Sequence, residues 1–306
     1  GGILYAIQLY PYIGDDSLYI GFMQAISTFC NAGFIFFDNN LPYKMVGDVL
    51  FNINTIALII IGGFGYIAAF DIWSYRKARR FADLKLHTKL MLIGTILLIA
   101  LGAIIFLSVE WANPKTFGPL PVWDKVLAAI FQSVTPRTAG IATVDYGQLH
   151  PITLFVSIIL MFIGAGPNST GGGVKISTVM VAILASCTLF NNRSDVEVFG
   201  RRIPMVTVFK ANGIIFLSIL LVLLATCYLA WDEPFDFIRL LFEVTSAFGT
   251  VGLTTGITPD LSESSKWVLI LVMFTGRVGV MTVIGTWALQ TKPHKPISYA
   301  EENVML

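Results

Sequence analysis

Three short breaks rich in small residues constrain the fold of this chain more than any other feature. Each break follows a short apolar run, and aligning the three places Gly33, Gly140 and Gly252 in register, at intervals of 107 and 112 residues. The chain is therefore predicted to be an array of one repeated unit. Because glycine adopts a positive φ without steric cost, successive carbonyls at each break can point into one shared cavity.

The composition places the repeated unit in a membrane. The chain has 306 residues, of which 55% are hydrophobic and only 13% are charged, whereas soluble domains contain roughly 25% charged residues. We therefore expect an integral membrane protein. The formal net charge of +1 argues against nucleic acid as a partner. Cys30, Cys187 and Cys227 are too few and too scattered for a disulfide framework or a zinc site.

Apolar segments of two lengths occur along the chain. A membrane span needs about 20 apolar residues. The long segments are Val49–Trp73, Leu86–Val109, Met205–Ala230, Trp267–Leu289 and an interrupted one, Ile152–Phe190. The short segments, each ending at a glycine break, are Tyr19–Phe29, Val122–Val134 and Phe235–Phe248. We predict that the short segments are re-entrant pore helices, since non-helical backbone is tolerated at membrane depth where it lines a cavity.

The interruption in the longest apolar segment runs from Gly164 to Lys175. Its glycines and proline cannot remain helical, so we predict a loop between two half-helices at membrane depth. Arg277 directly follows Gly276, which lies 24 residues beyond Gly252, the same interval that separates Gly164 from Gly140. A charged residue is therefore expected at the level of this loop.

Charge predicts the orientation of the helices. Basic residues gather in the loops Tyr75–Lys89 and Asn191–Lys210 and in the tail after Thr291, and the positive-inside rule places these segments in the cytoplasm. The opposite loops carry many carboxylates, which would concentrate cations at an outer mouth, although solubility alone accounts for them equally well. Gly1–Pro11 looks like the tail of a helix whose start is absent, so the sequence is expected to be a fragment.

Taken together, these residues resemble the potassium-translocating subunits of the Trk/Ktr/HKT superfamily, particularly the KtrB branch. The motifs that carry the resemblance are Thr135–Gly140, Met161–Lys175 and Ser246–Leu253. The resemblance implies an all-α integral membrane fold in which repeated units of outer helix, pore helix with filter loop, and inner helix form a pseudo-fourfold, potassium-channel-like pore. The third inner helix is broken by the Gly-rich loop.

The same resemblance implies how the chain divides. Residues 1–84 would be the remnant of the second repeat, 85–203 the third repeat with its interrupted inner helix, and 204–306 the fourth repeat with a short cytoplasmic tail. The first repeat would be missing.

The resemblance also implies the site residues. Backbone carbonyls would bind potassium in a filter made of Asn31, Ala32, Gly33, Phe34, Thr138, Ala139, Gly140, Ile141, Thr250, Val251, Gly252 and Leu253. Gating residues below the filter would be Gly164, Gly166, Ser169, Thr170, Gly171, Gly172, Gly173, Lys175 and Arg277. Physical arguments support these gating roles, because a positively charged side chain in the path opposes potassium entry and a Gly-rich loop can change between two arrangements at low cost. Purely structural roles stay open for Arg277, which could tie loop carbonyls together, and for Lys175, which could extend to the cytoplasm.

Two residues beside the filters are less regular. The first filter has Asn31 where the others have threonine, which matters only if side chains take part in selection. Arg137 is expected to point away from the filter, towards Glu243, Asp145 or another acidic group. The alternative is that the positive charge of Arg137 lies inside the filter and slows the passage of cations.

The resemblance implies channel-like potassium uptake driven by the membrane potential, and it leaves sodium dependence open. Members of this branch form homodimers in the cell (plasma) membrane and are gated by a cytosolic nucleotide-binding ring of the KtrA type. Potassium would be the substrate, no covalent cofactor is expected, and nucleotide would act only through the partner subunit. Membrane lipid is the other expected partner. The basic loops would contact the ring, unless they only determine the topology.

Other functions remain as alternatives. A TrkH-type potassium subunit is one alternative, although the short tail and compact loops favour the KtrB branch. A secondary transporter with alternating access also uses broken helices and repeats, but inverted repeats would alternate in orientation, whereas the three units here run the same way. A membrane enzyme has little support, because no Ser/His/Asp, metal or paired-carboxylate constellation occurs at membrane depth.

Overall fold

The computed structural model describes residues 1–38, 40–74, 81–190 and 195–288, and this part of the chain is mostly helical. The helices are α1 (Gly2–Ile13), α2 (Ser17–Phe29), α3 (Leu41–Lys44), α4 (Val49–Gly63), α5 (Tyr66–Ser74), α6 (Leu86–Glu110), α7 (Val122–Val134), α8 (Pro151–Phe162), α9 (Ile176–Phe190), α10 (Met205–Asp232), α11 (Phe237–Gly249), α12 (Glu263–Val278) and α13 (Val280–Ala288). Short 3-10 turns lie at Gly14–Asp16, Phe81–Asp83, Tyr146–Gln148 and Thr258–Asp260. Strands β1 (Val196–Val198) and β2 (Arg201–Ile203) form an antiparallel hairpin.

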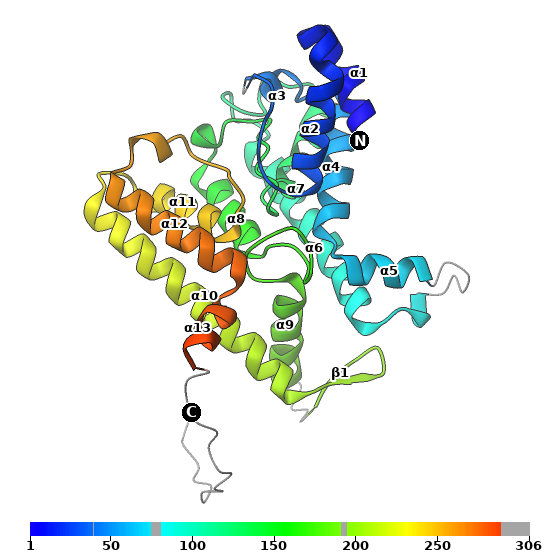
Figure 1. The fold of residues 1–306 in the computed structure, drawn as a ribbon, viewed down its shortest axis with the longest axis vertical. Helices are drawn as coiled ribbons and strands as arrows, with labels where there is room; N and C mark the ends of the chain where they lie inside the picture. The colour runs from blue at the N-terminus through cyan, green and yellow to red at the C-terminus, as the bar shows by residue number, and fades with distance from the viewer. Residues whose placement is uncertain (39, 75–80, 191–194, 289–306) are drawn as a thin grey trace, which may run out of the picture.

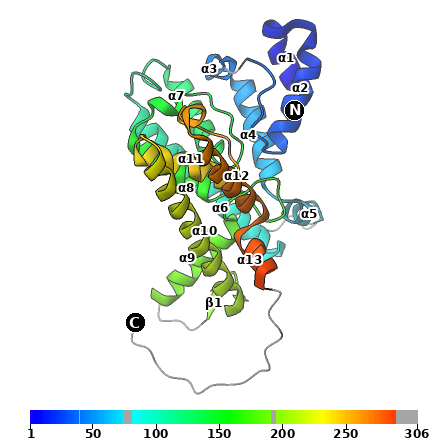
Figure 2. The same ribbon diagram turned by 60° about the vertical axis from the view of Figure 1, so that its left-hand side comes forward.

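The helices form three neighbouring groups. Figure 1 shows α1, α2 and α4 on one side, α10, α11 and α12 on the other, and α6 to α9 between them, and after a turn of 60° Figure 2 again shows α1 and α2 at the edge of the molecule. The β1–β2 hairpin lies at the end of the molecule opposite α1 (Figure 1). A buried cluster around Phe106, Ile158 and Phe242 joins α6, α8 and α11, so the middle and last groups share a core, whereas α1 and α4 pack around a separate cluster that includes Tyr5 and Phe51.

Most of the predicted helices are present with similar bounds. The three short helices that end at the glycine breaks are α2, α7 and α11, and α8 and α9 flank the interruption. Within the described residues, α6 and α10 are each long and apolar enough to cross a membrane, and the bent pair α4 and α5 would make a third candidate. The described chain is therefore built from apolar helices suited to a bilayer.

The prediction of one continuous helix over Val49–Trp73 is wrong. The chain bends by 96° between α4 and α5, at Gly65, whose φ is 85°. The interrupting loop causes the bend, because the Gly166 amide donates to the Gly63 carbonyl at 2.9 Å and the Tyr66 amide donates to the Asn168 carbonyl at 3.4 Å. The loop thus takes the backbone partners that a continuous helix would have used.

Two further segments differ from their predictions. The span predicted at Trp267–Leu289 is divided at Gly279, with a φ of 94°, into α12 and α13, and Leu289 lies outside the described residues. The segment Asn191–Lys210, predicted as a basic loop leading into the helix that begins at Met205, also contains the β hairpin, which was not predicted. Residues 75–80, 191–194 and 289–306, which hold many of the basic residues, also lie outside the described part, so their sidedness stays a prediction.

Close approach between helices depends on two glycines. A Cβ on Gly62 would overlap the Phe29 carbonyl at the end of α2, and a Cβ on Gly276 would overlap the Phe248 carbonyl near the end of α11. Both glycines lie on the helix that follows a glycine break. Because only glycine allows this contact, α4 and α12 pack directly against the ends of the short helices.

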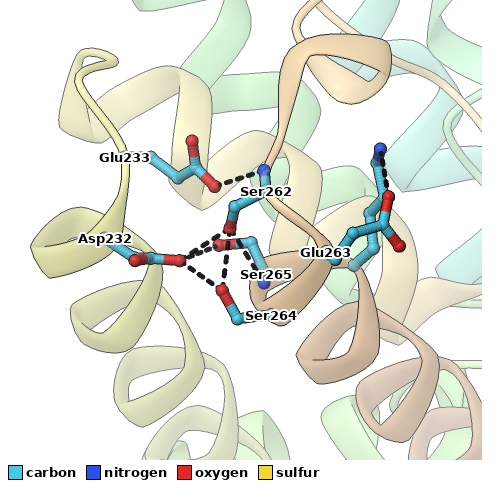
Figure 3. Close-up of polar contacts among 7 residues, drawn as sticks. Asp232, Glu233, Ser262, Glu263, Ser264 and Ser265 are labelled. Atoms are coloured by element: carbon cyan, nitrogen blue, oxygen red, sulfur yellow. Dashed lines mark hydrogen bonds and ion pairs between the residues drawn. The ribbon is translucent and has the colours of Figure 1, made fainter.

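Hydrogen bonds from serines connect the two long helices of the last unit. Asp232, at the end of α10, accepts from the hydroxyls of Ser262 and Ser264 at 2.6 Å each, and Glu233 accepts from the Ser262 amide at 2.8 Å (Figure 3). Burial opposes ionisation of Glu233, but the hydrogen bonds from Ser262 outweigh it and hold the pKa below its usual value. Ser262 also caps α12, so this contact sets where that helix begins.

Glu110 connects α6 to the start of α8 in the preceding unit through hydrogen bonds. Its replacement is therefore expected to destabilise the protein. Its carboxylate is fully buried and accepts four hydrogen bonds of 2.6 to 2.9 Å, from Asn113, Thr116, the His150 amide and Thr153. Glu110→Ala leaves the hydroxyls of Thr116 and Thr153 and the His150 amide without this acceptor, while Asn113 keeps only its bond to the Gln148 carbonyl, and the loss costs about 3 kcal/mol. Thermal unfolding in detergent should therefore begin at a clearly lower temperature.

The control for this prediction is Glu263→Ala, because the Glu263 side chain is 86% exposed and surface changes usually stay within about 0.5 kcal/mol. Equal unfolding temperatures for the two variants would contradict the role given to Glu110.

Candidate functional site

The backbone takes an unusual conformation after each short helix. The residue two before each break glycine has a positive φ, with values of 49° for Asn31, 76° for Thr138 and 51° for Thr250. The glycines follow with 75°, 75° and 92° at Gly33, Gly140 and Gly252, and the intervening residue does not share the positive sign. Because φ alternates in sign, successive carbonyls need not point to opposite sides as they do in a strand.

The same pattern of hydrogen bonds holds each of these segments against its helix. The amides of Ala32, Ala139 and Val251 donate to the carbonyls of Ser27, Thr135 and Ser246 at 2.9, 3.1 and 2.9 Å. The hydroxyls of these same three helix residues donate to the carbonyls of Phe34, Ile141 and Leu253 at 2.8, 2.5 and 2.6 Å. The amides therefore face the helix, and the outermost carbonyl of each segment is fixed to it.

The remaining carbonyls of the three segments are free of protein donors. Within the described residues, no hydrogen bond is accepted by the carbonyls of Asn31, Ala32, Gly33, Thr138, Ala139, Gly140, Thr250, Val251 and Gly252. Ala32 and Gly252 are exposed and the other two break glycines are half-buried, so unpaired carbonyls here are open to water or to a dissolved ion. A set of nine at equivalent positions is therefore available to a ligand.

The three segments converge on one place. A Cβ on Gly33 would lie 3.1 Å from the Val251 carbonyl oxygen and 3.4 Å from that of Ala139, and a Cβ on Gly140 would overlap the Val251 carbonyl. All three break glycines line a single open cavity of about 340 Å³, together with Tyr43 and Tyr146. The structure thus brings the predicted filter residues together from positions far apart in the sequence.

Sequence analysis missed a set of side chains that support the segments from behind. Each lies three residues before a helix residue whose hydroxyl donates to a filter carbonyl: Gln24 before Ser27, Gln132 before Thr135 and Glu243 before Ser246. Gln24 accepts from the Phe36 amide, Gln132 contacts Thr143 and Tyr146, and Glu243 accepts from Thr254, Thr255 and Thr258. The common interval before Ser27, Thr135 and Ser246 is the signal that could have identified them.

The interrupting loop is closed at its base by backbone contacts, and it is hydrogen-bonded to the bend between α4 and α5. Ile163 and Val174 form an isolated parallel bridge, and the Gly164 amide donates to the Val174 carbonyl at 2.9 Å. The Thr170 hydroxyl donates to the Gly62 carbonyl at 3.2 Å, and the Ser169 hydroxyl donates to the Gly166 carbonyl at 2.6 Å. Gly173 has a φ of 70°. The predicted loop residues therefore form one compact turn.

Two cationic side chains hold this turn from the opposite side. Arg277 of α12 donates to the Thr170 carbonyl, and Lys175 donates to the Gly171 carbonyl at 2.6 Å. Both cations also line a cavity of about 170 Å³ with Gly173 and Phe248. Lys175 therefore binds the loop instead of extending away from it, and Arg277 lies level with the loop as its spacing predicts.

Arg137 has a different partner from the one expected. Its guanidinium is buried and donates to the Thr95 hydroxyl of α6 at 3.4 Å, so it points away from the break glycines. No ion pair with Glu243 or Asp145 occurs in the described residues. Glu243 is occupied by the three threonines, so α6 and not an acidic group lies behind this segment. The negative end of the α7 dipole favours a cation at this position.

The carbonyl oxygens gathered here are chemically suited to hold a cation that has lost its water. Neutral carbonyl oxygens replace the hydration shell of an alkali ion in this kind of site. The ends of α2, α7 and α11, where the partial charge is negative, adjoin the same place. The Gly-rich turn and its two cations lie at one end of the three segments, and the open cavity lies at the other.

Comparison with known proteins identifies the family. Residues 6–294 match the model of the TrkH family, described as a cation transport protein. The chain is 39% identical over 287 residues to Ktr system potassium uptake protein B of Bacillus subtilis (strain 168), covering 94% of this chain and 64% of the relative. It is 38% identical to the protein of the same name from Vibrio alginolyticus, covering all of this chain and 66% of the relative.

Two further relatives extend the comparison. Potassium/sodium uptake protein NtpJ of Enterococcus hirae is 35% identical over 316 residues, with 100% of this chain and 68% of the relative covered. The crystal structure of the potassium transporter TrkH from Vibrio parahaemolyticus has the same fold, with a TM-score of 0.71 at 20% identity, covering 94% of this chain and 60% of that one. The chain spans about two thirds of the length of these curated relatives. On the family match and these identities, the chain belongs to the TrkH family of cation transport proteins.

Proposed function

We propose that this chain is the channel-like translocating part of a Ktr-type potassium uptake system. The observation that carries the proposal is the set of nine carbonyls at the three glycine breaks, which accept no hydrogen bond within the described residues. Potassium would pass between these carbonyls, with the outer carbonyls of Phe34, Ile141 and Leu253 held in place by the helix hydroxyls. The names of the relatives, potassium uptake and potassium/sodium uptake, support this choice of ion.

We infer that the turn from Gly164 to Lys175 is the gate of this path. It lies against the filter segments, and it has backbone contacts with the bend at α4 and α5 and side-chain contacts with Arg277. A Gly-rich turn that is held by hydrogen bonds and not by an apolar core can exchange between two positions at modest cost. Arg277 and Lys175 would oppose a potassium ion at this depth for as long as the turn stays in place.

The wider assembly follows from the same proposal. The repeated units would form a pseudo-fourfold pore in the cell membrane, with the basic loops on the cytoplasmic side. The Ktr relatives are named as parts of a system, which supports a regulatory partner. We propose a homodimer gated by a cytosolic ring of the KtrA type, with nucleotide acting only through that ring. Sodium as a coupled ion is supported by the name of the Enterococcus hirae relative.

A TrkH-type subunit is the second candidate, because the matched solved structure has that name and the same fold. An alternating-access carrier is less well supported. The three short helices α2, α7 and α11 all end at a break with the same signs of φ, whereas inverted repeats would present opposite ends.

Potassium uptake by the full-length protein tests the proposal. We expect the protein, with its regulatory partner, to restore growth at low potassium in a host that lacks its own uptake systems. Rubidium influx should depend on the membrane potential. A correctly inserted protein that gives no influx, or whose influx is coupled to an organic substrate, would contradict the proposal.

A further inference from the structure

A cavity lined by both cationic and apolar residues lies beside the β1–β2 hairpin. It has a volume of about 340 Å³ and is formed by the first turns of α6, α9 and α10 together with β2. The hairpin places it at the end of the molecule opposite α1 (Figure 1). We refer to it as the hairpin cavity. None of the filter or gating residues named above lines it, so it is separate from the site already described.

The cationic residues gather at one end of the hairpin cavity. On α10 the lining residues recur at helical spacing, so they share one face of the helix and extend over about 10 Å. The polar ones come first and the apolar ones follow, in the order Thr207, Lys210, Ala211 and Ile214. On α6, His87 precedes Leu90 in the same way. Both helices begin directly after a basic segment, so the cationic end adjoins the loops and the apolar end lies deeper along the helices.

The positive charge of the cavity is not neutralised within the protein. Lys210 is exposed and forms no ion pair within the described residues. Arg202 of β2 pairs with Asp195 at 2.6 Å, but a guanidinium has five N–H donors and can bind a second group. The lining contains no carboxylate, and neither α6 nor α10 has an acidic residue in its first turn. The cavity is therefore suited to an anion.

The surroundings of the cavity indicate what kind of anion fits. Helices α6 and α10 are long and apolar enough to cross a membrane, so their first turns would lie at a surface of the bilayer. Val206 and Phe209, which flank the cavity residues of α10 in sequence, are apolar and exposed. A free phosphate would use the cations and leave the apolar part of the cavity empty. A phospholipid has a phosphate and an acyl chain, and basic pockets between membrane helices are known to bind lipid headgroups.

We propose that the hairpin cavity binds an anionic phospholipid, such as phosphatidylglycerol. The phosphate contacts Lys210 and Arg202, with the half-buried His87 as a further donor. The first part of an acyl chain packs on the apolar lining residues, which are Leu90, Val181 and Ile214. The inference goes beyond the proposed function, because it requires the chain to lie in a membrane but does not depend on a potassium path.

The test compares full-length variants that are purified without the regulatory partner in a neutral detergent. Arg202→Gln with Lys210→Gln removes two cations of the cavity. The matched control, Arg201→Gln with Lys85→Gln, removes two cations from the adjoining segments, neither of which lines the cavity. Phosphatidylglycerol should protect the parent and the control pair against thermal unfolding. In the cavity pair, we expect the half-protecting concentration to rise by about tenfold or more, because each basic residue near an anionic lipid strengthens its binding. Native mass spectrometry should show correspondingly less bound lipid.

Two other ligands determine which part of the lipid is recognised. Phosphatidylcholine carries a phosphate but no net charge, and inorganic phosphate has no acyl chain, so neither should protect at these concentrations. Equal protection by either, equal shifts in both variant pairs, or no protection of the parent would overturn the lipid site. A cavity pair that keeps parental lipid protection but co-purifies with less regulatory partner would also overturn it, since the cations would then contact that partner. Uptake is not measured here, so failure of the proposed function would be recognised separately.

Discussion

Potassium uptake is expected to be lost when Gly140 is replaced by aspartate. Gly140 has a φ of 75°, which costs a residue with a Cβ roughly 1 kcal/mol. The larger effect is steric and electrostatic, because the new Cβ would overlap the Val251 carbonyl and the carboxylate would enter the group of free carbonyls. The two neighbouring segments must then separate. We expect uptake at the level of the host without the transporter, measured as rubidium influx with the protein quantified in the membrane.

The matched control is Gly14→Asp. Gly14 also has a positive φ, of 73°, but a Cβ there would meet nothing within 4 Å. It directly follows α1 and lies outside the basic loops proposed to contact the ring. Uptake by this variant should equal that of the parent. Normal uptake by the Gly140→Asp variant would show that Gly140 does not line the path, and the carrier alternative would then become the better explanation.

The elements predicted best from the sequence were those defined by local signals. The helix predicted at Val122–Val134 has those bounds in the structure, because Pro121 precedes it and the small-residue break follows it. The helices α6 and α10 also match closely, since long apolar runs leave few alternatives. The short helices were recognisable because each apolar run is followed within a few residues by a small-residue break that contains a glycine of positive φ.

Features that depend on distant residues were not predictable in this way. The bend between α4 and α5 is caused by contacts with Gly166 and Asn168, about 100 residues further along the chain. Apolar periodicity alone therefore predicted a straight helix. Glycines at 62, 63 and 65 were the local hint, but glycine is also common in straight helices of membrane proteins.

The candidate site shows the same division between local and distant information. The break glycines were found by self-comparison, because they recur at equivalent positions. The supporting side chains Gln24, Gln132 and Glu243 were missed, since two amides and one carboxylate do not appear alike in sequence although they fill one role. The partner of Arg137 was predicted wrongly because charge complementarity pointed to an acid, whereas the buried guanidinium contacts Thr95.

Removing the cations that hold the Gly-rich turn is expected to accelerate potassium uptake. Arg277 donates to the Thr170 carbonyl and Lys175 to the Gly171 carbonyl, and hydrogen bonds from charged groups contribute about 1.5–3 kcal/mol each. In Arg277→Gln with Lys175→Gln both contacts are weakened, and the positive charge near the path disappears. Because each 1.4 kcal/mol changes a population tenfold, we expect uptake without the regulatory partner to rise by about tenfold or more. The measurement is the initial rate of rubidium influx per transporter in the membrane.

Two further variants make this prediction specific to the turn. Lys266→Gln removes a positive charge from the start of the same helix, where Lys266 pairs with exposed Glu263, and its uptake should equal that of the parent. Arg277→Lys keeps the charge but replaces the planar donor group. If the arginine acts through hydrogen bonding, this variant should be partly accelerated, and if it acts only through charge, it should stay slow. Parental rates in Arg277→Lys and in the double variant would mean that other contacts hold the turn. The backbone bonds to Gly63 and Tyr66 at the α4–α5 bend would then be the next candidates, since they remain intact when both cations are removed.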